Sequence, residues 1–89
     1  MKVTKVIAMG LGLSFSSAGF SSPKCTTEPK DKWMKKEEAE TKIKQLGYTI
    51  RKFGTEGSCY EVKGNNSKGE KVEAYFNPTN ANFVSEKKD

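Results

Sequence analysis

Residues 36–53, KEEAETKIKQLGYTIRKF, change from one periodicity to another at Gly47. Before this glycine, Ala39, Ile43 and Leu46 are spaced as i, i+4 and i+7, which places them on one face of a helix. Two glutamates lie in the first turn of this segment and two lysines lie near its last turn, in the order that the helix macrodipole favours. Gly47 stands where a left-handed residue commonly ends a helix. The pattern predicts a helix that runs to Leu46 and buries all three apolar residues.

After Gly47, apolar residues alternate with polar ones, as in strands that have one buried face. Phe53 falls out of phase with Tyr48 and Ile50, which indicates a bulge or an early strand end. The connections are short, so neighbouring strands should be antiparallel. Three runs carry the pattern and a short fourth run follows, at residues 48–53, 58–63, 72–76 and 83–84. The predicted fold class is α+β, with one helix packed on a three- to four-stranded antiparallel sheet.

The strand phasing divides the side chains between two faces of the sheet. The face that the helix covers should hold Tyr60, Val62, Val72, Ala74 and Phe76. The open face should hold Glu61, Glu73 and Tyr75, and these three are the candidate partner-binding residues, because tyrosine is enriched at interface hot spots. One alternative is that Tyr75 packs against the N-terminal segment. Another is that the two glutamates face each other across the strands, where carboxylates near lysines more often form ion pairs than do acid–base chemistry.

The first 22 residues have the three parts of a secretion signal. Lys2 and Lys5 precede the apolar stretch VIAMGLGLSF, and small residues follow it. A retained membrane anchor is the alternative, but the continuous apolar run is short for a bilayer span. We expect a periplasmic or secreted protein without stable membrane insertion after cleavage. Its parts would be a cleaved signal peptide, an extended polar lead-in and one folded domain, at residues 1–22, 23–32 and 33–86.

The chain has two cysteines, Cys25 and Cys59. An even cysteine count in a small exported chain favours a structural disulfide. A redox pair or a metal site is the alternative, but there is no CxxC spacing and no histidine. We therefore expect a disulfide between Cys25 and Cys59, no metal and no cofactor.

The composition of the chain argues against two classes of function, nucleic-acid binding and catalysis. The chain has 16 basic and 11 acidic residues, and lysines alternate with glutamates instead of clustering as nucleic-acid binding requires. Histidine, the commonest general base, is absent, and a disulfide would leave no thiol nucleophile. We expect a monomer that is not an enzyme and does not bind nucleic acid.

Three segments together resemble the PepSY domain family: Gly47-Tyr48, Cys59-Tyr60-Glu61-Val62 and residues 72–78, VEAYFNP. The resemblance covers about residues 25–86. It is greatest to small stand-alone secreted members, which carry one cysteine before the helix and another in a CYEV strand. Where the family usually continues with a Thr-Gly-Glu turn, this chain has residues 79–82, TNAN, which leaves the final turn and last strand open.

The resemblance implies a helix on an antiparallel sheet, in agreement with the residue patterns. It also implies a role, because such domains occur in protease propeptides and cell-envelope proteins, where they restrain peptidases or bind partners. The expected function is a non-enzymatic periplasmic or secreted binding module, a candidate regulator or inhibitor of a periplasmic or secreted peptidase. The alternative is a small structural or accessory cell-envelope protein with no protease connection.

Overall fold

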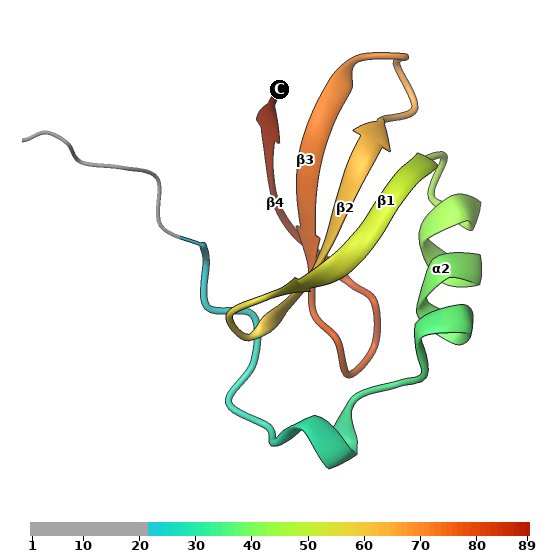
Figure 1. The fold of residues 1–89 in the computed structure, drawn as a ribbon. Coiled ribbons are helices and arrows are strands. Elements are labelled where there is room, and N and C mark those ends of the chain that lie inside the picture. The colour runs from blue at the N-terminus through green and yellow to red at the C-terminus, as the bar shows by residue number, and fades with distance from the viewer. Residues whose placement is uncertain (1–21) are drawn as a thin grey trace, which may run out of the picture.

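A computed structural model describes residues 22–89, so the predicted signal peptide, apart from Ser22, lies outside the described residues. The sheet order is β1-β2-β3-β4, and each neighbouring pair is antiparallel. The helix α2 packs on one face of this sheet, beside β1 (Figure 1). The predicted α+β class is confirmed, with four strands. The elements are η3, a 3-10 helix (Lys30–Lys32), α2 (Lys36–Gln45), β1 (Thr49–Glu56), β2 (Cys59–Asn65), β3 (Lys71–Phe76) and β4 (Phe83–Lys88).

The end of α2 agrees with the sequence prediction to within one residue. Leu46 is the C-cap, and its backbone N–H donates to the carbonyls of Lys42 and Ile43, at 3.2 and 3.0 Å. Gly47 follows with a φ of 103°, which glycine adopts without the clash that a side chain would cause. The predicted termination of the helix at Gly47 is confirmed.

Two of the three helix residues predicted to be buried are buried. Ala39 and Ile43 have no exposed surface and belong to the main core cluster. The prediction for Leu46 is wrong, because 51% of this residue is exposed. Periodicity places Leu46 in phase with Ile43, but the helix ends there, and its last turn lies beside the loop between β3 and β4 instead of over the strands.

The core lies between α2 and the inward face of the sheet. Trp33 packs edge-on against Tyr60, with ring centroids 5.5 Å apart, and the Tyr60 hydroxyl donates to the carbonyl of Met34. These contacts fix the path of the chain into the helix. The strand residues predicted to face inward are all buried: Tyr60, Val62, Val72, Ala74 and Phe76.

A bulge in β1 explains the phase slip in its sequence. The register shifts between Ile50 and Lys52, which returns Phe53 to the inward face, where it packs against the core with Tyr48 and Ile50. Gly64 lies opposite this irregularity, and an added Cβ there would lie 1.8 Å from the carbonyl oxygen of Thr49. The predicted bulge is confirmed, and a glycine at this position lets the two strands approach.

The final strand is longer than the sequence predicts. β4 extends over six residues, whereas apolar residues mark only its first two positions. The preceding loop is closed by the Asn77 N–H, which donates to the Asn82 carbonyl at 2.8 Å. Ala81 takes a φ of 64° within that loop. The final turn and last strand are therefore formed, although the sequence departs here from the pattern of the family that it resembles.

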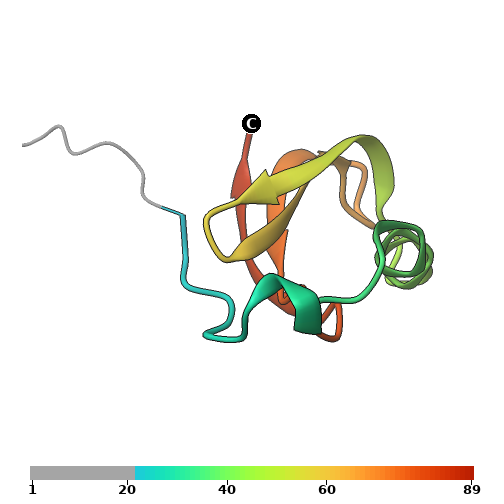
Figure 2. The same cartoon turned by 60° about the horizontal axis from the view of Figure 1, so that its bottom comes forward.

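The disulfide between Cys25 and Cys59 is present, with the two Cα atoms 5.1 Å apart. It attaches the N-terminal segment to the start of β2, on the sheet face opposite α2. The Cys25 N–H also donates to Ser58 Oγ at 2.9 Å. From there the chain runs through η3 to α2 on the other side of the sheet (Figure 2).

Candidate functional site

The three residues predicted to bind a partner lie on the sheet face opposite α2. Glu61 pairs with Tyr75 across β2 and β3, while Glu73 pairs with Lys63. The two carboxylates are therefore diagonal neighbours, and the alternative that they face each other directly is wrong. The loop between β2 and β3 sets the register, because it pairs Asn65 with Lys71. In this register, each glutamate lies opposite a residue other than the second glutamate.

Tyr75 is buried beside the disulfide. Only 2% of this residue is exposed, and it forms a second small core with Cys25 and Cys59. The N-terminal segment that Cys25 anchors covers the ring, so the open face is closed at this point. Of the two alternatives drawn from the sequence, packing against the N-terminal segment is the one that the structure shows for Tyr75.

The two glutamates beside Tyr75 both form a hydrogen bond with its hydroxyl, and Glu73 also forms an ion pair. The Tyr75 hydroxyl donates to Glu73 Oε1 at 3.4 Å, and Lys87 Nζ lies 3.8 Å from the same oxygen. Burial raises the pKa of Glu61, and the negative charge of Glu73 raises it further, while Lys63 opposes the shift. Burial likewise raises the pKa of the Tyr75 phenol. A partner-binding role for Glu61 and Glu73 stays a prediction.

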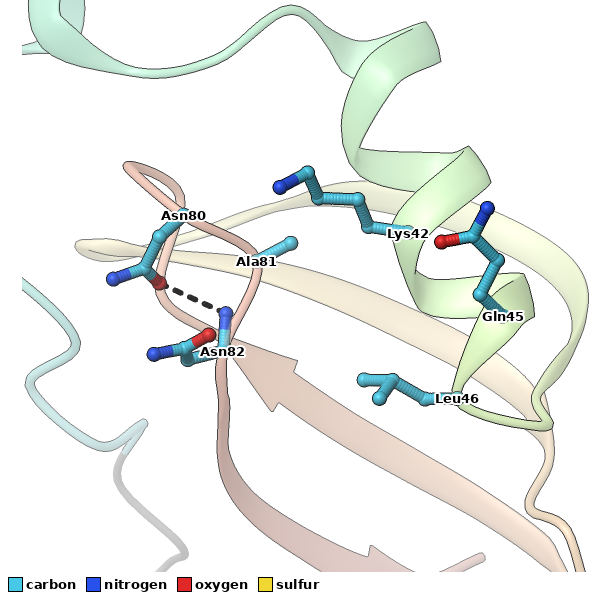
Figure 3. Close-up of a pocket in the computed structure, with 6 residues that line it drawn as sticks. All are labelled: Lys42, Gln45, Leu46, Asn80, Ala81 and Asn82. Carbon is cyan, nitrogen blue, oxygen red and sulfur yellow. Dashed lines mark hydrogen bonds between the residues drawn. The ribbon is translucent and has the colours of Figure 1, made fainter.

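The opposite side of the molecule has a hollow that the sequence did not predict. It lies between the C-terminal end of α2 and the loop from β3 to β4, and its volume is about 240 Å³ (Figure 3). Lys42 and Leu46 extend from the helix toward the loop. The six lining residues are Lys42, Gln45 and Leu46 on the helix and Asn80, Ala81 and Asn82 on the loop.

The loop wall of this hollow is fixed by its own hydrogen bonds. The Ala81 N–H donates to the Asn77 carbonyl at 2.6 Å, and the Asn82 N–H donates to Asn80 Oδ1 at 2.9 Å. Ala81 is 3% exposed and belongs to the main core, although its φ of 64° lies in a region that residues with side chains seldom occupy. The wall is therefore preorganised before anything binds to it.

Large apolar side chains are exposed in and next to this hollow. Leu46 is 51% exposed, and Phe83, which directly follows Asn82 of the wall, is 50% exposed. The inner side of the Phe83 ring contacts Phe76, with centroids 6.1 Å apart. A partner that covered either side chain would remove apolar surface from water, which favours binding.

The hollow was missed because its two walls are 34 or more residues apart in the sequence. Helical periodicity assigned Leu46 to the core, and the loop residues 79–82 contain no motif with a known chemistry. The only available signal was the position of Leu46 next to Gly47, where the helix ends. Sequence reasoning can locate such an end, but it cannot show whether the last side chain lies over the sheet or beyond it.

Neither surface has the composition of a metal centre. Within residues 22–89, no group of three or more histidine, cysteine, aspartate or glutamate residues could hold a metal ion. The residues that line the hollow carry apolar groups, carboxamides and one ammonium group, and all of these can contact a bound partner.

The sequence matches the protein family described as "Peptidase propeptide and YPEB domain" over residues 4–87. No curated protein and no solved structure matches the chain. Domains of this family are generally non-catalytic and propeptide-like, and they are typically extracellular or periplasmic. In the part of the chain that the structure describes, no helix is long and apolar enough to cross a membrane.

Proposed function

Because the chain belongs to the peptidase propeptide and YPEB domain family, we propose that it is a non-enzymatic binding module that regulates an exported peptidase. The match to this family carries the proposal, since it extends over residues 4–87. The protein would act in the periplasm or outside the cell, where its partner peptidase would also be found.

Two features of the fold support a binding role. The N-terminal segment is attached to the sheet by the disulfide, which suits a small domain that must stay folded outside the cell. Apolar side chains, Leu46 and Phe83 foremost, remain exposed beside a fixed loop. A small domain that exposes such side chains gains stability when a partner covers them.

The proposal can be tested with the purified oxidised protein. The protein is immobilised, exposed to a periplasmic extract of its source organism, and the eluate is assayed for peptidase activity and analysed by mass spectrometry. We expect one peptidase to be enriched over a resin that carries an unrelated small basic protein. The purified peptidase should then cleave a standard substrate at a rate that depends on the concentration of the added protein, with saturation.

Two results would contradict peptidase regulation. One is an eluate of envelope components without any peptidase, which supports the accessory envelope role instead. The other is a captured peptidase whose activity and stability do not change at saturating protein.

A further inference from the structure

The hollow between α2 and the β3–β4 loop has an apolar centre and a polar rim. Leu46 supplies the exposed apolar surface, and the nearly buried Ala81 faces it from the loop. Gln45 supplies a carboxamide on the helix side, whereas the side chains of Asn80 and Asn82 extend from the loop away from the helix (Figure 3). Its volume of about 240 Å³ lies below the roughly 300–1,000 Å³ of typical small-molecule pockets. The size and the open rim suit one inserted side chain of a longer chain better than an enclosed small ligand.

The polar groups of the rim are available for a partner. Within residues 22–89, the side chains of Gln45 and Asn82 form no hydrogen bond, and the Asn80 carboxamide uses only its oxygen, which accepts from the Asn82 N–H. A carboxamide offers both donors and an acceptor, so it can pair with the N–H and C=O groups of an extended backbone. The Gln45 carboxamide on the helix side could therefore pair with the backbone of a peptide strand that lies in the hollow.

The charge of the lining is positive and uncompensated. Lys42 is the one charged residue among the six that line the hollow. Within the described residues, it forms no ion pair, although Glu38 stands one turn earlier on the same helix. A negatively charged group on the partner would complement it, whereas a positively charged group would be repelled.

We propose that this hollow binds an extended peptide segment that presents one large apolar side chain next to a carboxylate. The inference rests on the proposed function, in that the segment would belong to the regulated peptidase. The apolar side chain would cover Leu46, the carboxylate would pair with Lys42, and the Gln45 carboxamide would bind the peptide backbone.

The test uses the full oxidised protein, labelled with ¹⁵N, and blocked pentapeptides as probes. The first peptide is Gly-Ser-Leu-Asp-Gly, the second replaces aspartate by lysine, and the third replaces leucine by alanine. The side-chain NH₂ signal of Gln45 and the backbone N–H signals of Leu46 and Ala81 report on the two walls of the hollow. We expect them to shift with the first peptide. Affinity should be about three-fold weaker for the lysine peptide, from the loss of a surface ion pair, and about ten-fold weaker for the alanine peptide, from the loss of apolar contact.

Two variants with the same change of charge show whether the peptide preference depends on the hollow or on the general surface charge. Lys42→Glu should reverse the preference, so that the lysine peptide binds more tightly than the aspartate peptide. Lys44→Glu is the matched control, because Lys44 is an exposed lysine of the same helix that does not line the hollow, and it should leave the order unchanged. The backbone signals away from α2 show that each variant is folded.

Three outcomes would overturn the inference. The first is the absence of any shift of the Gln45, Leu46 and Ala81 signals up to 10 mM peptide. The second is a set of shifts on the face of Glu61 and Tyr75 instead. The third is an unchanged preference in Lys42→Glu.

The failure of the site and the failure of the proposed function can be told apart. If the Lys42→Glu variant binds the peptidase as tightly as the native protein does, the proposed site is wrong while peptidase regulation stands. If the peptides bind in the hollow but no peptidase partner is found, the site stands while peptidase regulation fails.

Discussion

Replacing Cys25 and Cys59 together by alanine should lower the free energy of unfolding by about 4 kcal/mol. The two residues are 34 positions apart, and the chain-entropy relation for a loop of that length gives this value. A domain of this size has a total stability of roughly 3–10 kcal/mol. The disulfide therefore accounts for a large part of the stability, and the double variant should be marginally folded at 37 °C.

The structure indicates a second contribution to this loss of unfolding free energy, in addition to the loop entropy. The disulfide holds the N-terminal segment over Tyr75, which is 2% exposed. Without the bridge, the segment keeps only weak attachments, such as the 2.9 Å bond from the Cys25 N–H to Ser58 Oγ. Release of the segment would expose the tyrosine ring, so we expect the loss to reach or exceed the entropic value.

The assay is urea denaturation of the oxidised native protein, the double alanine variant and the native protein in excess reductant. The variant and the reduced protein should coincide, because both lack the bridge. In a thermal scan of the same samples, the melting temperatures of the variant and of the reduced protein should fall by about 15 °C or more, since each kcal/mol corresponds to about 4–8 °C in a small domain. A loss below about 1 kcal/mol, with the native protein shown by mass to be bridged, would refute the reasoning.

Four further substitutions test the two faces of the sheet. Tyr75→Ala should cost about 3–5 kcal/mol in urea denaturation, because the ring is buried beside the disulfide, and a change below 1 kcal/mol would contradict its burial. Leu46→Ala should cost less than about 1 kcal/mol, whereas Ile43→Ala, in the core of the same helix, should cost about 2–5 kcal/mol; equal losses would contradict the exposed position of Leu46. Glu61 has a raised pKa in the folded state, so its contribution to stability is present at acidic pH and is lost as the pH rises through that pKa. Glu61→Gln should therefore raise the unfolding free energy relative to the native protein more at pH 7 than at pH 4, and a difference that is independent of pH would contradict the shift.

The helix and the strands β2 and β3 could be predicted because each buries residues at a regular spacing, and β1 could be predicted although a bulge interrupts its spacing. Ala39 and Ile43 lie one helical turn apart, and Val72, Ala74 and Phe76 alternate along β3. Because burial on one face requires apolar residues at these spacings, the spacings can be seen in the sequence. The remainder of β4 could not be predicted, because residues 85–88, SEKK, are polar, and that part of the strand is specified by its pairing with β3.

The environment of the candidate site was harder to predict than the elements that carry it. Strand phasing placed Tyr75 on the correct face, but its burial depends on a segment some 50 residues earlier that the disulfide brings back. The pairing of Glu61 with Tyr75 depends on the length of the loop between β2 and β3. Such features arise from contacts between distant segments, and local periodicity contains no information about them.

The dimensions of the hollow limit what it can contribute to peptidase binding. Burial of one large apolar side chain is worth about 1.5–3 kcal/mol, and an exposed ion pair adds at most about 1 kcal/mol. A micromolar complex requires about 8 kcal/mol, so the hollow alone would give an affinity near the millimolar range. A regulator that acts at lower concentrations must therefore use more surface, and a stable interface usually buries about 1,200–2,000 Å² in total. Phe83 and Val84 are exposed directly after the loop wall and at the edge of the sheet, so a partner segment that leaves the hollow along β4 would cover them next.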